Sequence, residues 1–240
     1  MGSTTPASTF TLPDPATVEA MSAQEVLRYC VDAFPGTVAL ACSFQKEESV
    51  LLDMLFASDP KARVFALDTH YLFPETYDLW REVEERYGTR VEVFEGPSPE
   101  KLEATHGAEL WNTKPDLYLA LAKVEPLVRA LEPYDAWASG IRRDQSPSRA
   151  TTPKLQWSAR YGVWKVHPLA DWDEKRVWAY IAVNEVPYNP LHDVGYRSIG
   201  CIPCTRPTSP DEEERAGRWA GSDKLECGIH LDSPITEGME

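Results

Sequence analysis

The sequence has no long hydrophobic run and few basic residues. No segment approaches the roughly 18 consecutive apolar residues that a membrane-spanning helix needs. Lys and Arg number 24 against 38 Asp and Glu, a formal net charge of -14, whereas a general nucleic-acid-binding protein presents a basic face. We therefore expect neither a membrane span nor a nucleic-acid partner, although a local cluster of cations can still bind a small anion.

Cysteine is also scarce. The chain has 5 cysteines, an odd number that does not suit a secreted disulfide framework. The first 15 residues are rich in Ser, Thr and Pro and lack the basic segment of a secretory signal. We therefore expect a cytoplasmic protein whose cysteines are reduced, metal-binding or catalytic. Cys30, in a predicted helix, and Cys42, at a predicted strand end, are expected to be small core residues.

Apolar runs of strand length alternate with helical segments. Strands are predicted over 37–42, 63–67, 91–94, 136–139 and 163–167, and helices over 16–33, 49–56, 74–87 and 114–131. This alternation predicts an α/β fold with a doubly wound, mostly parallel sheet. Ligands bind such sheets beyond the carboxyl ends of the strands, so the polar loops after Cys42, Leu67 and Ser139 should meet there.

The composition divides the chain into three parts. Residues 1–15 are predicted to be a flexible tail, 16–205 a nucleotide-binding domain and 206–240 a mobile C-terminal arm. From Pro187 onward the chain becomes rich in Pro and Gly, and it carries an acidic run at 211–214.

Several segments could bind an anion. The loop 43–49 joins a strand to a helix, where backbone N–H groups and the helix dipole suit phosphate, but it has no Walker signature and could be an ordinary connection. Leu67-Asp68-Thr69 ends the second strand with groups that could hydrogen-bond a nucleotide. Arg142 and Arg143 follow a strand and a Gly, and Arg binds phosphate or sulfate bidentately. Arg215 and Arg218 could do the same, or could only pair with the acidic run.

Two cysteine motifs remain. Cys227 precedes Gly228 and lies three residues before His230, and nearby cations would favour its reactive thiolate form. Cys201-Ile202-Pro203-Cys204 could be a redox pair, half of a zinc site or half of an iron–sulfur site.

Together these segments resemble the sulfonucleotide reductases, which are the adenylyl-sulfate and phosphoadenylyl-sulfate reductases of assimilatory sulfate reduction. The resemblance extends from about Val38 to His230. It rests on Ser43-Phe44, on 67–69 with 73–76, on Lys123-Val124-Glu125-Pro126-Leu127, on Gly140-Ile141-Arg142-Arg143 and on Glu226-Cys227-Gly228-Ile229-His230.

The resemblance implies an adenine-nucleotide α-hydrolase-like fold and a two-step reaction. Cys227 would attack the sulfur of the nucleotide's sulfate, and AMP or adenosine 3′,5′-bisphosphate would leave. Thioredoxin or a similar dithiol would then release sulfite from the S-sulfocysteine. The family also suggests self-association. The substrate-binding positions it implies are Ser43, Phe44, Gln45, Lys46, Leu67, Asp68, Thr69, Lys123, Arg142, Arg143, Arg215, Arg218 and His230.

One departure from the family pattern concerns a cofactor. Members that act on adenylyl sulfate bind a 4Fe–4S cluster through an adjacent Cys-Cys pair and a CxxC. Cys201 and Cys204 match the CxxC, but Tyr118 and Leu119 stand at the adjacent pair, and Ala122 replaces an Arg. Because two thiolates do not satisfy such a cluster, we predict that this chain binds no intact cluster and that Cys201 and Cys204 are a remnant dithiol.

The same departure leaves the substrate open. The retained CxxC favours adenylyl sulfate, whereas the absent pair favours the 3′-phosphorylated nucleotide; we predict adenylyl sulfate. A second class would be a nucleotide-binding relative that has lost catalysis. A third would be an ATP-pyrophosphatase-like adenylating enzyme, which predicts a Ser-Gly-Gly-x-Asp-Ser type of loop that 43–49 lacks.

Overall fold

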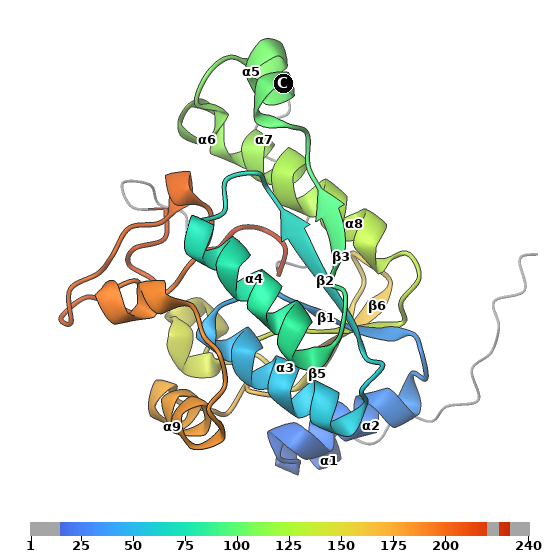
Figure 1. Cartoon of the computed structure of the whole chain (residues 1–240). Coiled ribbons are helices and arrows are strands. Elements are labelled where there is room, and N and C mark those ends of the chain that lie inside the picture. The colour runs from blue at the N-terminus through green and yellow to red at the C-terminus, as the bar shows by residue number, and fades with distance from the viewer. Residues whose placement is uncertain (1–14, 220–225, 231–240) are drawn as a thin grey trace, which may run out of the picture.

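The computed structural model describes residues 15–219 and 226–230, so the predicted N-terminal tail lies almost wholly outside the described residues. Helices and strands alternate along most of the chain (Figure 1). The strands are β1 Val38–Ala41, β2 Arg63–Asp68, β3 Glu92–Glu95, β4 Ala136–Ala138, β5 Leu155–Ser158 and β6 Val163–Val166. The α-helices are α1 Pro15–Ala20, α2 Ala23–Ala33, α3 Lys46–Ser58, α4 Pro74–Tyr87, α5 Pro99–His106, α6 Leu110–Thr113, α7 Pro115–Leu119, α8 Glu125–Leu131 and α9 Glu174–Asn184.

The six strands form one sheet in the order β3-β2-β1-β4-β6-β5. All neighbouring pairs are parallel except β5 with β6, which are antiparallel. The predicted mostly parallel α/β sheet is therefore confirmed. The order reverses between β1 and β4, and this switch point is where such sheets open a ligand crevice.

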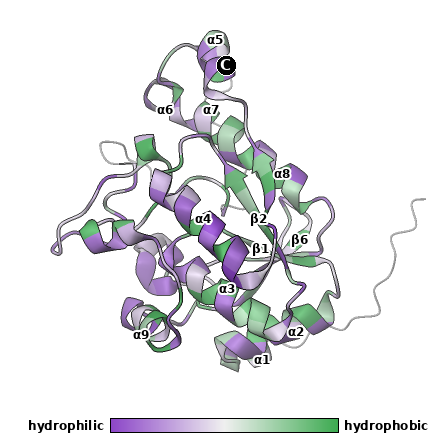
Figure 2. Ribbon diagram, viewed as in Figure 1, coloured by the Kyte–Doolittle hydropathy of each residue, from purple (hydrophilic) through white to green (hydrophobic). Residues whose placement is uncertain are grey.

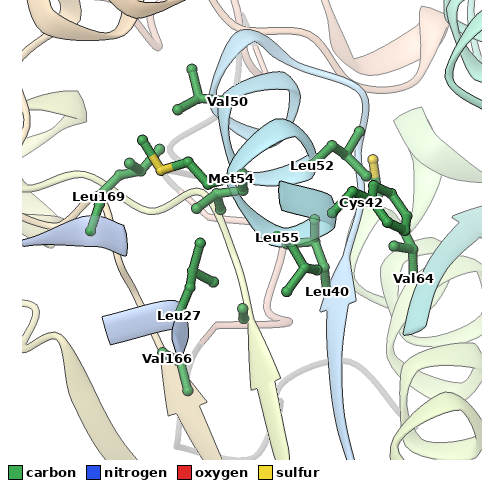
Figure 3. Packing of buried hydrophobic residues seen from close by; sticks show 14 of the residues in the cluster. Leu27, Leu40, Cys42, Val50, Leu52, Met54, Leu55, Val64, Val166 and Leu169 are labelled. Carbon is green, nitrogen blue, oxygen red and sulfur yellow. The ribbon is translucent and has the colours of Figure 1, made fainter. Parts of the chain in front are cut away.

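Successive residues of the strands face opposite sides of the sheet. Leu40, Val64 and Val166 pack in the larger core with residues of α2, α3, α4 and α9, whereas Phe65 and Trp137 pack with Leu127 and other residues of α8. Figure 3 shows part of the larger core, with side chains of the sheet and of α2 and α3 gathered together. The sheet is covered on both faces, which is why its inner strands are mostly hydrophobic (Figure 2).

Some elements differ from the sequence prediction. The segment predicted as one helix over 16–33 is two helices, because Ser22 caps α2 in a capping box with Glu25. The predicted helix 114–131 is interrupted by η1 Ala120–Val124, a π-helical turn. Strand β5 and helices α5, α6 and α9 were not predicted. No helix among the described residues is long and apolar enough to cross a membrane.

The predicted arm packs closely against the domain as far as residue 219. Thr205 forms a β-bridge with Arg218, and the Trp219 N–H donates to the Cys204 carbonyl at 3.1 Å. The predicted boundary between residues 205 and 206 thus falls inside a hydrogen-bonded turn.

A buried network of charges fastens this segment to the loops at the switch point. The Lys46 Nζ lies 2.8 Å from Glu214, and the Arg142 Nη2 donates to both Glu214 carboxylate oxygens at 2.8 Å. The Arg142 Nε also donates to Glu47 at 2.9 Å. Lys46 and Arg142 are fully buried, so each needs its carboxylate partners in the low-dielectric interior. We call Lys46, Glu47, Arg142 and Glu214 the charge network.

Replacing Arg142 by Ala should lower the free energy of unfolding by about 3–5 kcal/mol, because Glu47 and Glu214 would stay buried after losing one of the two cations that they share. Urea denaturation measures the change. The control is Arg63→Ala, since the Arg63 pair with Glu92 is exposed and should cost less than about 1 kcal/mol. Equal losses for the two variants would contradict the buried network.

Candidate active site

A pocket opens at the switch point of the sheet, at the carboxyl ends of β1, β2 and β4. Its lining joins the loop after β1, the end of β2, the loop after β4 and the last described segment of the chain. Of the residues predicted from the sequence, the pocket is lined by Ser43, Phe44, Gln45, Leu67, Lys123, Arg215, Arg218, Cys227 and His230.

The loop after β1 is held in an unusual conformation. Phe44 has a φ of 57°, which is uncommon for a residue other than Gly, Asn or Asp. Its ring is buried and stacks on Trp80 with 5.0 Å between centroids, and this packing fixes the turn. Gln45 then accepts a hydrogen bond from the Ile199 N–H at 2.7 Å. The loop delivers the N-terminus of α3 to the pocket, an arrangement that suits an anion.

Glu48 is a buried carboxyl group on the pocket wall. It accepts hydrogen bonds from the Ser43 Oγ at 2.9 Å and from the Gly140 N–H at 3.1 Å. Burial, with a further contribution from the charge of Glu47, raises the pKa of Glu48 to about 7. Glu48 is therefore largely uncharged at mildly acidic pH, which lowers the repulsion that an anion meets in the pocket.

Four cationic side chains line the pocket: Lys123, Arg149, Arg215 and Arg218. Burial and the neighbouring Arg149 lower the pKa of Arg215 to about 10, so it stays charged at neutral pH. Burial acts to lower the pKa of Lys123, but Cys201 and Cys227 raise it above its ordinary value. The pocket thus concentrates positive charge in an acidic protein.

Arg218 is fixed against the backbone of Gly200. Its Nη1 donates to the Ile199 carbonyl at 3.0 Å, and a Cβ placed on Gly200 would lie only 2.2 Å from the Arg218 Nη2. Any residue larger than glycine at position 200 would therefore displace the guanidinium. The buried Arg218 Nε has no hydrogen-bond partner within the described part of the chain, which is typical of a group that awaits a ligand.

Cys227 lines the same pocket and is only 8% exposed. The preceding Glu226 anchors it, because its carboxylate lies 2.7 Å from the Arg149 Nη2 and 3.2 Å from the Arg215 Nη2. Gly228 follows with a φ of 82°, in the left-handed region that favours glycine. The Arg160 Nη1 donates to the Gly228 carbonyl at 3.0 Å.

His230 closes the far end of this segment. Its ring stacks on Trp137 with an interplanar angle of 3°, and the Lys165 Nζ donates to its carbonyl at 2.8 Å. Burial, with nearby cations, lowers the pKa of His230 well below its usual range, so the ring is neutral. We therefore expect it to offer packing and hydrogen bonds to a ligand, with no charge.

The π-helical turn places Lys123 in the pocket. The Glu125 N–H reaches the Ala120 carbonyl five residues back. Pro126 explains this geometry, because it has no N–H to donate to Ala122 and its ring clashes with that carbonyl in a regular helix. The helix widens for one turn instead, as π-bulges do at functional sites.

Cys201 and Cys204 lie beside the pocket in a second, small hydrophobic cluster that also contains Tyr118, Leu119 and Cys227. Cys201 accepts a hydrogen bond from the Thr69 Oγ1 at 3.3 Å. The hydrogen bond with Cys204 lowers the pKa of Cys201 well below the usual range for a thiol, and it raises the pKa of Cys204. All 5 cysteines of the chain are free thiols.

The residues around this pair do not fit a 4Fe–4S cluster. Tyr118 and Leu119, at the two positions where the family pattern has cysteines, are fully buried and fill the space next to the pair. Burial and the neighbouring Cys201 raise the pKa of Tyr118, so the phenol stays protonated and is a poor ligand. A 4Fe–4S cluster takes four thiolates, and among the described residues this cluster of side chains offers only Cys201, Cys204 and Cys227.

Five residues predicted to bind substrate do not line the pocket. Lys46 and Arg142 belong to the charge network, and Arg143 lies outside the pocket, where it pairs with Glu19 and donates to the Thr152 carbonyl. Asp68 accepts hydrogen bonds from the His70 N–H and the Tyr77 hydroxyl, and Thr69 donates to Cys201. The sequence could not exclude these residues, because all the partners named here except His70 lie 9 or more positions away along the chain.

Other pocket residues were not predicted. Arg149, Glu48, Trp137 and Gly200 all line it. A weak signal existed for Arg149, because it follows the Arg142-Arg143 pair in the same polar loop after a strand. Trp137 reads as an ordinary strand residue, and only the stack with His230 shows that it faces the pocket.

Comparisons with known proteins identify the family to which the chain is similar. The phosphoadenosine phosphosulfate reductase domain matches residues 37–207. An adenosine 5'-phosphosulfate reductase of Shouchella clausii is 44% identical over 208 residues, which cover 86% of each chain. A phosphoadenosine 5'-phosphosulfate reductase of Gloeobacter violaceus is 43% identical and covers 88% of this chain and 90% of its own.

A solved structure is similar as well. The phosphoadenylyl-sulfate reductase of Candida auris, in a phosphate complex, superposes with a TM-score of 0.73 at 36% identity. The match covers 80% of this chain and 94% of that one.

Replacing Glu48 by Gln should change how stability depends on pH. The folded protein holds a proton on Glu48 up to about pH 7, whereas the unfolded chain loses it near its ordinary value of 4.5. Stability therefore falls as pH rises through this window, and Glu48→Gln should remove that fall, on the order of 2–3 kcal/mol.

Urea denaturation at several pH values between 4.5 and 8 measures the difference. The control is Glu82→Gln, which removes an exposed carboxylate on α4 and should leave the pH profile unchanged. Parallel profiles for wild type and Glu48→Gln would contradict a protonated Glu48.

Proposed function

This chain belongs to the phosphoadenosine phosphosulfate reductase family, and we propose that it reduces adenylyl sulfate to sulfite and AMP with Cys227 as the nucleophile. One observation carries the proposal: Cys227 lines a pocket together with Lys123, Arg215 and Arg218. A thiol among cations at the switch point of a nucleotide-binding sheet suits attack on an activated sulfate.

The first step is a displacement at sulfur. The Cys227 thiolate attacks the sulfate sulfur, the bond from that sulfur to the bridging oxygen breaks, and AMP leaves with the electron pair. The product on the protein is S-sulfocysteine. Lys123, Arg215 and Arg218 would neutralise the negative charge on the sulfate and on the departing phosphate, and such fixed charges are most effective in a pocket with little water.

The charges of the pocket support the unphosphorylated nucleotide. Glu226 already pairs with Arg149 and Arg215, which leaves limited positive charge for a ligand. The phosphate and sulfate of adenylyl sulfate carry one negative charge each, whereas the 3′-phosphate of phosphoadenylyl sulfate would add about two more. The second candidate substrate remains phosphoadenylyl sulfate, because the relative from Candida auris is named for it.

The second step needs a dithiol from outside the nucleotide pocket. We propose thioredoxin or a similar dithiol protein as the final electron donor, in the reducing cytoplasm, where free thiols persist. Cys227 is buried while it faces the pocket. Ion pairs at Glu226 hold it there, and such pairs can break and re-form, so the segment 226–230 can move between substrate and donor.

We also propose that the chain works without an iron–sulfur cluster. The support is Tyr118 and Leu119, which are buried next to Cys201 and Cys204 and offer no thiolate. No step of the reaction above requires a metal, since Lys123 and the Arg side chains supply the positive charge.

Mixing the protein with adenylyl sulfate in the absence of any dithiol should add about 80 Da to Cys227, the mass of a sulfonate group. Intact-protein and peptide mass spectrometry detect the adduct, and chromatography detects AMP. Phosphoadenylyl sulfate should react at a lower kcat/KM.

The variant Cys227→Ser should bind the nucleotide but form neither adduct nor AMP. The matched control is Cys30→Ser, a buried cysteine in the large core, far from the chemistry; it should react like wild type. A wild-type protein that binds adenylyl sulfate and never releases AMP would instead be a nucleotide-binding relative without catalysis.

Anaerobically purified protein should contain iron and acid-labile sulfide far below the amounts of a 4Fe–4S cluster. Colorimetric iron and sulfide assays measure both. The double variant Tyr118→Cys with Leu119→Cys provides the comparison, since it restores a four-thiolate set and should gain iron on reconstitution. Near-stoichiometric iron in the unmodified protein would refute the cluster-free proposal.

A further inference from the structure

The chain keeps a buried pair of thiols for which the first step has no use. Cys201 and Cys204 are 0% and 3% exposed. The Cys204 N–H donates to the Cys201 carbonyl at 3.0 Å, so a short turn brings the two cysteines together. Because the surrounding residues do not suit a cluster, the pair is available for redox chemistry.

The nucleophile lies in the same small cluster as this pair. Cys201, Cys204 and Cys227 belong to one group of packed buried residues, and all three raise the pKa of Lys123. The chain that leads toward Cys227 is also tied to the pair, through the hydrogen bond from Trp219 to the Cys204 carbonyl. Three thiols therefore lie within one small buried cluster.

We infer that Cys201 and Cys204 form a built-in resolving dithiol, which releases sulfite from S-sulfo-Cys227 before any external donor binds. This inference rests on the proposed function. The pair then takes a direct part in the reaction. Cys201 is the attacking sulfur, because Thr69 donates a hydrogen bond to it and such a bond stabilises a thiolate.

The electrons and atoms balance in two exchanges. The Cys201 thiolate attacks the Cys227 sulfur, a Cys201–Cys227 disulfide forms, and sulfite leaves with the electron pair of the broken bond. The Cys204 thiolate then attacks the Cys201 sulfur, a Cys201–Cys204 disulfide forms, and Cys227 departs as a thiolate ready for another substrate. The dithiol supplies two electrons and gives up its two protons.

The external donor then reduces the Cys201–Cys204 disulfide. Ile202, between the two cysteines, is 49% exposed although it is a large hydrophobic residue. It gives a dithiol protein a surface contact directly at the turn. Cys227 would not need to leave the pocket in each cycle.

An experiment without an external donor separates internal resolution from direct attack by the donor. Full-length protein is reduced, freed of reductant under anaerobic conditions and mixed with excess adenylyl sulfate. With internal resolution, each chain should release one sulfite and two AMP, because regenerated Cys227 reacts a second time. Mass spectrometry should find a Cys201–Cys204 disulfide together with a sulfonate on Cys227.

Two variants test the order of the exchanges. Cys204→Ser should release one AMP and one sulfite and stop as a Cys201–Cys227 disulfide. The double variant Cys201→Ser with Cys204→Ser should release one AMP and no sulfite, and its single AMP shows that the variant is folded and reacts. Cys30→Ser should match wild type.

The outcomes are distinguishable. A wild-type chain that releases one AMP, keeps the sulfonate and yields sulfite only after dithiol is added overturns the resolving role and leaves the proposed function standing. A wild-type chain that releases no AMP overturns both. The wild-type stoichiometry alone decides the matter if a variant fails to fold.

Discussion

The architecture of the site depends on four charges that are buried together. Lys46 and Glu47 begin α3, Arg142 follows β4, and Glu214 comes from the C-terminal segment. Lys46 and Arg142 hold the pKa of Glu47 at about 2 although burial acts to raise it. None of these charges could remain in the interior without the others. The pairing therefore holds the C-terminal segment over the loops at the switch point, and Arg215, Arg218 and Gly200 take their positions from it.

The charged side chains around the pocket fall into two groups, those of the charge network and those that line the pocket. The cations of the charge network are paired with carboxylates, whereas the Arg218 Nε has no hydrogen-bond partner among the residues that the structure describes. Lys123 lines the pocket together with Cys227. Glu48 is largely neutral at mildly acidic pH, because its pKa is raised to about 7. An anion and a thiolate can thus meet in a protein with a net charge of -14, because the negative charges close to the pocket are either paired or protonated.

The sequence predicted what depends on local pattern. Strands β1, β2, β4 and β6 and the loop at Ser43 follow from apolar runs that end in polar residues, and those predictions agree with the structure. The sequence could not predict that Arg142 pairs with Glu214, 72 residues further along the chain, because ion pairs leave no periodic pattern in a sequence. The prediction of one continuous helix over 114–131 did not take account of Pro126, which interrupts the regular hydrogen bonding. The π-helical turn beside it places Lys123 in the pocket.

The wide turn at Pro126 has a consequence for how such a protein can change over generations. Proline sets the local geometry through its own ring, so Lys123 keeps its place whatever occupies positions 118 and 119. Those two positions are then free to exchange metal ligands for Tyr and Leu without moving the cation that lines the pocket. Point substitutions at these two positions could therefore add or remove the ligands of an inorganic cofactor while the rest of the site stays the same.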